Sequence, residues 1–170
     1  MDHRRELIER SIPFLEAVRN RTAGKELEDW LNGTHGPRSE LYGHLSRLIK
    51  LGVEEGWAAN AEVDGPNYRR SLIAPPSAET QYFSITAVYM NSHARYRGQY
   101  HAHPYGEINL VAPVDRDAQL AGPSGWQGPG WTAPAPGSHH YPEVRGGALI
   151  ALFYLPAGRI SYDITAPRGH

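Results

Sequence analysis

Residues 97–109 read Arg97-Gly-Gln-Tyr-His-Ala-His-Pro-Tyr-Gly-Glu-Ile-Asn109, and this run indicates a strand that carries a polar site. Side chains alternate between the two faces of a strand, so residues two apart point the same way. If the run is extended, one of its faces carries Arg97, Gln99, His101 and His103. Four polar groups on one face need either water or a polar interior site.

A tight turn is predicted where the strand meets Pro104-Tyr-Gly106. A second strand is expected over residues 107–112, and the turn between the strands returns Glu107 towards the two histidines. Two imidazoles and a carboxylate are suitable ligands for a divalent transition metal. The candidates for a fourth ligand are His139 and His140.

This pattern resembles the cupin family, whose first motif carries His-x-His and a later glutamate, and whose second motif carries one more histidine. The first motif matches His101-x-His103-x-x-x-Glu107, and the second matches Gly137-x-x-His140. The resemblance implies an antiparallel β-barrel and favours His140 over His139. Three positions depart from the family pattern, with Arg95 in place of a glycine, Ala135 in place of a proline and Val144 in place of an asparagine.

The composition excludes several classes of protein. A chain of 170 residues is expected to form one domain with a sizeable core. Its net charge of −1 and the lack of a basic run argue against nucleic acid or an anionic membrane surface as a partner. There is no cysteine, so disulfides and thiolate ligands are excluded. The charged first residues do not resemble a signal peptide, and the longest apolar run, 148–155, is too short to span a bilayer, so a cytoplasmic protein is expected.

Helical periodicity dominates residues 4–56. Pro13 is expected to kink or restart the first helix, with Ser11 as a cap. A second helix is expected between Thr22 and Gly33, and a third from about residue 37 to Gly56. The simplest interpretation is a helical layer that covers one side of a sheet.

From residue 57 onward the pattern is typical of strands. Residues 59–63 and 68–73 flank a hairpin signal, residues 83–90 alternate, and further strands are expected at 148–155 and 160–164. The sequence therefore predicts an α+β fold, with an N-terminal helical segment, 1–56, packed on a cupin-like antiparallel barrel, 57–170.

Residues 122–137 are rich in glycine and proline, and no regular structure is expected in them. Large aromatic side chains in a loop bury surface against another part of the protein. Trp126 and Trp131 therefore have two interpretations. The loop arches over the barrel mouth with Trp131 near an aromatic substrate, or both tryptophans hold the loop to the core.

Three longer motifs resemble the 4-hydroxylaminobenzoate lyase family. They are Glu55-Gly-Trp-Ala-Ala-Asn60, the run 96–109 and the run 130–147, and the similarity extends to residues 158–163. The resemblance implies conversion of 4-hydroxylaminobenzoate to 3,4-dihydroxybenzoate (protocatechuate) and ammonia in bacterial breakdown of nitrobenzoates. Two other functions stay open. One is a different metal-dependent cupin enzyme, a dioxygenase or isomerase acting on a small aromatic or sugar acid, and the other is a metal-poor binding cupin.

The atom balance of that reaction constrains its chemistry. Substrate and one water give the catechol and ammonia with no external electrons, so nitrogen has to leave by hydrolysis of an imine before the ring regains aromaticity. A metal would act as a Lewis acid on the hydroxylamine oxygen. Iron or manganese suits three histidines and a glutamate, and zinc, nickel and cobalt fit the same donors.

The substrate carboxylate needs an arginine. Arg97 is the first candidate, Arg69 or Arg70 the next and Arg145 the last, although Arg97 has alternative partners in Glu62, Glu79 and Glu143. Candidates for acid–base work, or for hydrogen bonds to the metal ligands, are Tyr105, His139, Gln99 and Asn109. Tyr105 and His139 have alternative roles in packing and at the surface. The remaining histidines, His170 among them, are expected to be solvated, and a homodimer is the expected assembly.

Overall fold

The computed structural model describes residues 2–168, so His170 lies outside the described residues. Three helices come first: α1 (His3–Val18), α2 (Lys25–Thr34) and α3 (Glu40–Glu55). The strands that follow are β1 (Ala61–Glu62), β2 (Tyr68–Ala74), β3 (Phe83–Ser92), β4 (Tyr96–Arg97), β5 (His101–His103), β6 (Ile108–Pro113), β7 (Gln119–Gly122), β8 (Gly125–Gln127), β9 (Gly130–Thr132), β10 (Ser138–His140), β11 (Glu143–Arg145) and β12 (Gly147–Pro156). None of the helices in this range is long and apolar enough to cross a membrane.

Helix α1 runs without interruption through Pro13, so the prediction that Pro13 restarts the helix is wrong. Asp2 caps this helix by accepting a hydrogen bond from the Arg5 amide. Ser11 lies in the helix interior, where its hydroxyl donates to the Leu7 carbonyl and pairs with the Tyr154 hydroxyl of β12. Packing of the buried side of α1 on the sheet outweighs the single backbone hydrogen bond that Pro13 cannot make.

The other two helices follow their cap signals to different degrees. The sequence favours Thr22 as the cap of the second helix, but α2 begins after Gly24, which makes no side-chain cap, and so Thr22 is not its cap. Ser39 caps α3 by accepting from the Tyr42 amide, and Gly56 ends α3 in the left-handed region at φ 86°. Both predictions for the ends of α3 are confirmed.

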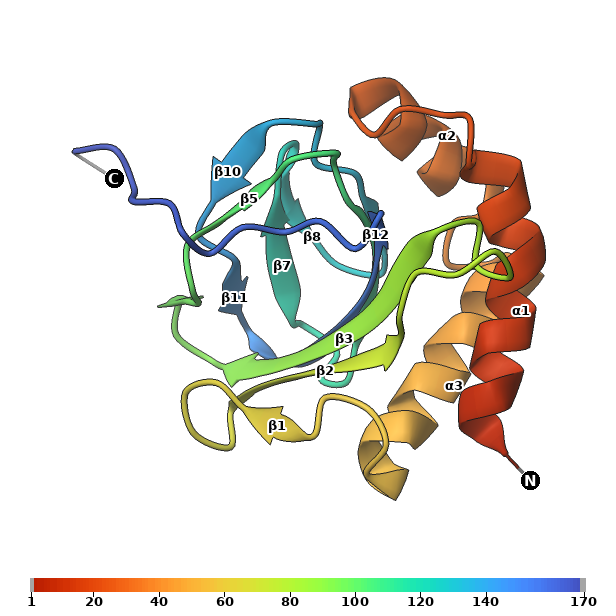
Figure 1. The fold of residues 1–170 in the computed structure, drawn as a ribbon. Coiled ribbons are helices and arrows are strands. Elements are labelled where there is room, and N and C mark those ends of the chain that lie inside the picture. Colours follow the sequence, from red (N-terminus) through yellow and green to blue (C-terminus); the bar gives the residue numbers. More distant parts are fainter. Residues whose placement is uncertain (1, 169–170) are drawn as a thin grey trace.

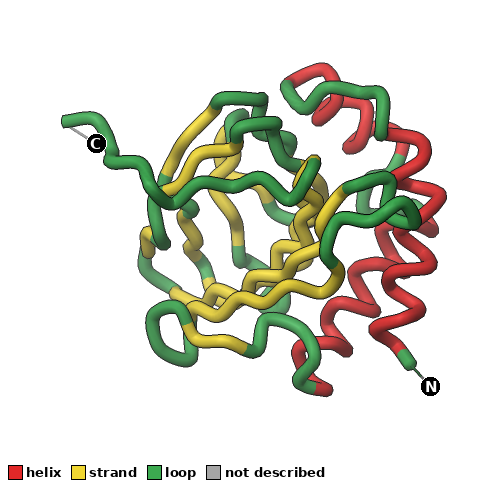
Figure 2. The backbone as a smooth tube through the Cα atoms, viewed as in Figure 1, coloured by secondary structure: helices red, strands yellow, loops and turns green. Residues whose placement is uncertain are grey.

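Three antiparallel sheets follow the helices. The largest has the strand order β1-β2-β3-β12-β6-β9, a second has the order β4-β11-β7-β8, and β10 pairs with β5. The helices lie on one side of the strands (Figure 1), and Figure 2 shows the same separation of helix from sheet. One core cluster contains side chains from the helices and from the six-stranded sheet. The expected combination of helices and antiparallel sheets is confirmed.

The six-stranded sheet has two different faces. Ile150, Leu152 and Tyr154 of β12 belong to the core shared with the helices. Leu149 and Ala151, on the other face, belong to a second cluster with Leu120 of β7 and Val144 of β11. Alternation along each strand therefore decides whether a side chain faces the helices or the space between the sheets.

Two predictions about irregular segments are wrong. Residues 160–164 form no strand, because only Ser161 makes a bridge, to Ala102. The glycine-rich stretch contains β8 and β9. Gly122 and Gly125 frame a two-residue turn that pairs β8 with β7, and β9 extends the six-stranded sheet beyond β6.

Candidate metal centre

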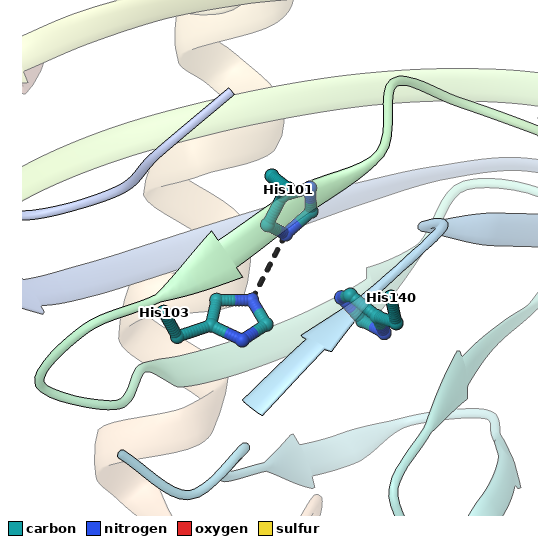
Figure 3. Close-up of side chains that lie close together, drawn as sticks. All are labelled: His101, His103 and His140. Atoms are coloured by element: carbon teal, nitrogen blue, oxygen red, sulfur yellow. Dashed lines mark hydrogen bonds between the residues drawn. The ribbon is translucent and has the colours of Figure 1, made fainter. Parts of the chain in front are cut away.

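The pairing of β5 with β10 brings three histidines together. His140 lies opposite His101 and Ser138 opposite His103, while His139 lies opposite Ala102 on the other face. Ring nitrogens of His101, His103 and His140 all lie within 4.8 Å of one another, and the three rings converge in Figure 3. The structure thus places His140 in the cluster, whereas His139 is exposed and pairs through Nδ1 with the Tyr100 hydroxyl. The sequence predicted β6 as the partner of the histidine strand, and that prediction is wrong.

Hydrogen bonds behind His101 and His103 fix their tautomers. His101 Nδ1 is 3.0 Å from the Gln99 carbonyl oxygen, which only accepts, so Nδ1 carries the proton. His103 Nδ1 is 3.0 Å from Ser138 Oγ. That hydroxyl donates to the Ala135 carbonyl at 2.6 Å, and it therefore accepts from His103. Both Nε2 atoms are left with lone pairs that face into the cluster.

The two Nε2 atoms lie only 2.9 Å apart (dashed in Figure 3). Two lone pairs at this distance repel unless a cation lies beside both of them. A shared proton would require an imidazolium, and burial, the largest cause, lowers the pKa of His101. The donor set therefore fits a metal ion better than it fits a histidine pair alone.

Glu107 adjoins this cluster through the turn after β5. Its Oε2 is 3.3 Å from His103 Nε2 and accepts from Asn109 Nδ2 at 2.9 Å. The His103 carbonyl accepts from the Gly106 amide, as the predicted turn requires. Gly106 has φ 83°, and a Cβ there would lie 2.7 Å from the Cβ of Ala23 in the segment before α2. Only glycine suits this position, so the turn that carries Glu107 depends on it.

The charge states of the cluster suit a cation. Burial is the main cause that lowers the pKa of His140, to about 4, so its imidazole is neutral at pH 7. Burial alone would raise the pKa of Glu107, but the adjoining imidazoles of His103 and His101 and the hydrogen bond from Asn109 outweigh it and lower that pKa. The site offers three imidazoles beside one carboxylate, which is a set of donors that binds divalent transition metals.

A cavity lies beside the cluster. The space in it that a water-sized sphere can enter is about 50 Å³, and His101, His140, Glu107 and Asn109 form part of its wall. Other parts of the wall are apolar, with Val88, Leu120, Ala151, Phe153 and Ile160. A largely apolar wall with a few convergent polar groups is typical of a site for a small molecule.

The structure places the candidate arginines in three different surroundings. Arg97 is exposed outside the cavity, and its Nε is 2.6 Å from Glu143 Oε1, so it takes one of its alternative partners. Arg69 lies opposite Tyr89 on the helical face, with its guanidinium 4.3 Å from the ring centre of that tyrosine. Arg70 lies opposite Val88 and lines the cavity. Of these three arginines the structure places Arg70 on the cavity wall, because β-sheet register decides which of them faces inward.

Arg145, the last candidate, stacks its guanidinium 4.1 Å from the Trp126 ring and donates to the Gln119 side chain. Neither Arg145 nor Gln119 lines the cavity, so this arginine also lies away from the site.

Trp131 is not at the cavity mouth. It is fully buried in the core beside Phe14 and Tyr42, and its indole Nε1 donates to the His35 carbonyl at 2.7 Å. Its pairing with Leu110 puts it on the helical face, whereas its neighbour Thr132 pairs with Asn109. The second interpretation, that Trp131 holds the loop to the core, is correct.

Two further candidates also point away from the site. The side chain of Tyr105 is 54% exposed at the tip of the turn. Gln99 is exposed, and it contributes its backbone, with the carbonyl accepting from His101 and the amide donating to the Tyr68 hydroxyl. Asn109, by contrast, is buried and lines the cavity.

Sequence reasoning missed two residues at the site. Ser138 orients His103, and its place two residues before His140 was the available signal. Tyr162 lines the cavity beside His101, with ring centres 5.7 Å apart. Burial, the first cause, raises the pKa of Tyr162 to about 12. No local pattern indicated Tyr162, because it follows the last strand in an irregular segment.

Helices on antiparallel sheets, with a buried cluster of three histidines beside a carboxylate and a cavity, define an α+β protein with a candidate metal-dependent active site. A family model described as 4-hydroxylaminobenzoate lyase (PnbB) matches residues 9–162. The chain belongs to the 4-hydroxylaminobenzoate lyase family.

Two relatives carry the name 4-hydroxylaminobenzoate lyase. The protein from Nocardioides sp. (strain LMS-CY) is 67% identical over 162 residues, which cover 95% of this chain and 96% of the relative. The protein from Pseudomonas putida is 59% identical over 174 residues, which cover 98% of this chain and 99% of the relative. A crystal structure of DMSP lyases is 16% identical in sequence, and the match covers 94% of this chain and 93% of that chain with a TM-score of 0.44.

Proposed function

We propose that this chain is a 4-hydroxylaminobenzoate lyase that converts 4-hydroxylaminobenzoate and water to 3,4-dihydroxybenzoate and ammonia. Near-full-length identity of 67% and 59% to two relatives of that name is the observation that carries the proposal. The buried histidine cluster and the cavity beside it offer a place for this chemistry.

We further propose that His101, His103, His140 and Glu107 hold one divalent transition metal. The lone pairs on the two Nε2 atoms and the carboxylate oxygen beside them support this assignment. Iron or manganese suits this donor set first, while zinc, nickel and cobalt also match it. When bound, such an ion would supply Lewis acidity for cleavage of the N–O bond.

The residues of the chain have separate tasks in this proposal. The apolar wall holds the aromatic ring and keeps bulk water from the reacting carbons. Asn109 donates to Glu107 and to Thr132 Oγ1 at 3.0 Å, and so holds the carboxylate towards the histidines. The overall balance consumes one water and releases ammonia. Hydrolysis at the ring carbon that bears nitrogen therefore has to precede rearomatisation.

We propose that Arg70 binds the carboxylate of the substrate. It is the only lysine or arginine among the described residues of the cavity wall. A guanidinium binds a carboxylate through two parallel hydrogen bonds, which also fixes the orientation of the ring. Arg97 is already engaged by Glu143, on the outside of the protein.

The finer fold assignment is also a proposal. The six-stranded and four-stranded sheets pack against each other through the second core cluster. This packing supports a cupin-like barrel, although no backbone hydrogen bonds join the two sheets among the described strands. The homodimer and the cytoplasmic location remain predictions from the sequence. Light scattering of the purified protein tests the first of them.

The main test is anaerobic incubation of the purified protein with 4-hydroxylaminobenzoate, with ammonia and the catechol measured together and metal content measured in parallel. Equal amounts of both products without oxygen support the lyase, whereas a requirement for oxygen indicates a dioxygenase. His101→Ala should lose both metal and turnover while its circular dichroism spectrum is retained. Full turnover by His101→Ala would exclude this metal centre.

A pair of variants tests the carboxylate assignment. Arg70→Leu should raise KM for 4-hydroxylaminobenzoate by about 30- to 900-fold, which corresponds to on the order of 2–4 kcal/mol, because a charge-assisted pair in a partly dry cavity is lost. Arg97→Leu is the matched control, and it should leave KM within a few-fold of the native value. A larger effect at Arg97 than at Arg70 would reverse the assignment.

A further inference from the structure

We propose that Tyr162 completes the receptor for the substrate carboxylate together with Arg70, and that it determines the preference for an aromatic acid. This inference rests on the proposed function and deepens it. The observation behind it is that the Tyr162 hydroxyl and the Arg70 guanidinium lie side by side on the wall of the cavity beside the histidine cluster.

The hydrogen bond between the two residues has a definite direction. Arg70 has donors only, so its Nη1 donates and the Tyr162 hydroxyl oxygen accepts. The hydroxyl proton of Tyr162 is then free to be donated to a third group, since a tyrosine is protonated at neutral pH. Within residues 2–168 the guanidinium of Arg70 makes no other hydrogen bond, so its remaining N–H groups are free for the same ligand.

The Arg70 guanidinium also lies over the Tyr162 ring, with 4.4 Å between its central carbon and the ring centre. This contact and the hydrogen bond together restrain the guanidinium beside the tyrosine. Two kinds of donor, the guanidinium and the hydroxyl, therefore lie together at one point of the wall. An anion with two oxygens, such as a carboxylate, matches that arrangement.

The pair lies at the boundary between the cavity and the outside. An outer groove lined by Leu72, Pro76 and Leu155 shares four wall residues with the cavity, and these are Arg70, Phe153, Ile160 and Tyr162. A carboxylate bound at this boundary stays partly hydrated, which lowers the cost of burying its charge. The ring then lies between the apolar walls, and the hydroxylamine group in para position points towards the histidines.

The position of Tyr162 relative to the histidines is set by the backbone. Its neighbour Ser161 exchanges two hydrogen bonds with Ala102, at 2.8 and 3.0 Å. Ala102 lies between His101 and His103 on β5. The strand that carries two of the histidines therefore also anchors the segment that carries Tyr162. This connection fixes the distance between the carboxylate receptor and the metal centre, and hence the length of substrate that spans them.

The experiment compares two stable ligands that differ only in the acid, 3,4-dihydroxybenzoate and catechol. Their affinities for the metal-loaded protein are measured by isothermal titration calorimetry, which needs no turnover. Tyr162→Phe should weaken the binding of 3,4-dihydroxybenzoate by about ten- to a hundredfold, which is the usual effect of losing one hydrogen bond to a charged group. The affinity for catechol should stay within about threefold of the native value. Tyr105→Phe, which removes an exposed hydroxyl outside the cavity, is the matched control, and it should change neither affinity.

The outcomes separate this inference from the proposed function. Ammonia release by the native protein tests the lyase alone, and its failure leaves the binding comparison intact. Equal weakening of both ligands by Tyr162→Phe would mean that Tyr162 only supports the cavity wall. Unchanged affinities with a lower kcat would mean that Tyr162 donates a proton near the metal centre. Either result overturns its role as a carboxylate receptor.

Discussion

Removal of the Ser138 hydroxyl should weaken metal binding without touching a metal ligand. Ser138 Oγ accepts from His103 Nδ1 at 3.0 Å and donates to the Ala135 carbonyl at 2.6 Å. The Ser138→Ala variant leaves the Nδ1–H of a buried imidazole without its acceptor. The ring can then rotate, and it can also exchange tautomers so that the proton moves to the Nε2 that faces the cluster.

The size of the effect follows from this single contact. Loss of the hydrogen-bond partner of a metal-ligating histidine typically lowers metal affinity by about 10–100-fold. At 25 °C this corresponds to about 1.4–2.7 kcal/mol, which is close to the value of one hydrogen bond at a buried polar group. Stability of the metal-free fold should change much less, because Ser138 lies at the end of a two-stranded sheet.

The assay is a competition between the protein and a chelator of known affinity, with the metal measured after equilibration. Ser138→Thr keeps the hydroxyl and should bind within a few-fold of the native protein. Ser124→Ala removes a hydroxyl that donates to Glu28 and not to a metal-ligand candidate, and it should not change metal affinity. If Ser138→Ala binds metal as tightly as the native protein, the tautomer argument for His103 is refuted.

Three other predictions concern the chemistry, the core and the response to pH. Turnover in oxygen-18 water should label the C4 hydroxyl of the product, because nitrogen leaves by imine hydrolysis; mass spectrometry that finds this oxygen unlabelled would contradict the proposed route. Trp131→Ala should lower the free energy of unfolding by about 3–5 kcal/mol, because a fully buried indole is removed. Trp126→Ala removes a half-buried ring stacked on Arg145, and it should lower the free energy of unfolding by less than about half as much. Urea titration of the two variants compares these losses. Burial alone would raise the pKa of Glu143, but Arg95 and Arg97 outweigh it and lower that pKa below the ordinary 4.5. The ionised carboxylate therefore stabilises the fold above about pH 4.5, and this stability is lost as the pH falls through the lowered pKa. The Tm advantage of the native protein over Glu143→Gln should therefore shrink as the pH falls from 7 through 4, and an advantage that grows on acidification would contradict the ion pairs.

Local features of the chain were predictable from the sequence because they depend on a few neighbouring residues. The two-residue repeat of a strand puts His101 and His103 on one face wherever the strand lies. The turn after them needs a glycine at position 106, and the cap residues Ser39 and Gly56 mark the ends of α3. His101, His103 and Glu107 followed from these local rules as metal-ligand candidates, whereas the choice of His140 over His139 came from the resemblance to the cupin family.

Long-range pairing decided the rest. Alternation shows that Arg69 and Arg70 point in opposite directions, but only the register of β2 on β3, with Arg70 opposite Val88, turns Arg70 towards the cavity. The same reasoning places Trp131 in the core beside the helices, because β9 pairs with β6 in one particular register.

The site itself is also a product of long-range contacts. The sequence could not show that β5 pairs with β10, that Ser138 orients His103, or that the segment after β12 returns to place Tyr162 beside Arg70. Each of these contacts joins residues that are 35 or more positions apart. Contacts of that kind form only when the buried faces of all the sheets are satisfied together, so no short window of sequence specifies them.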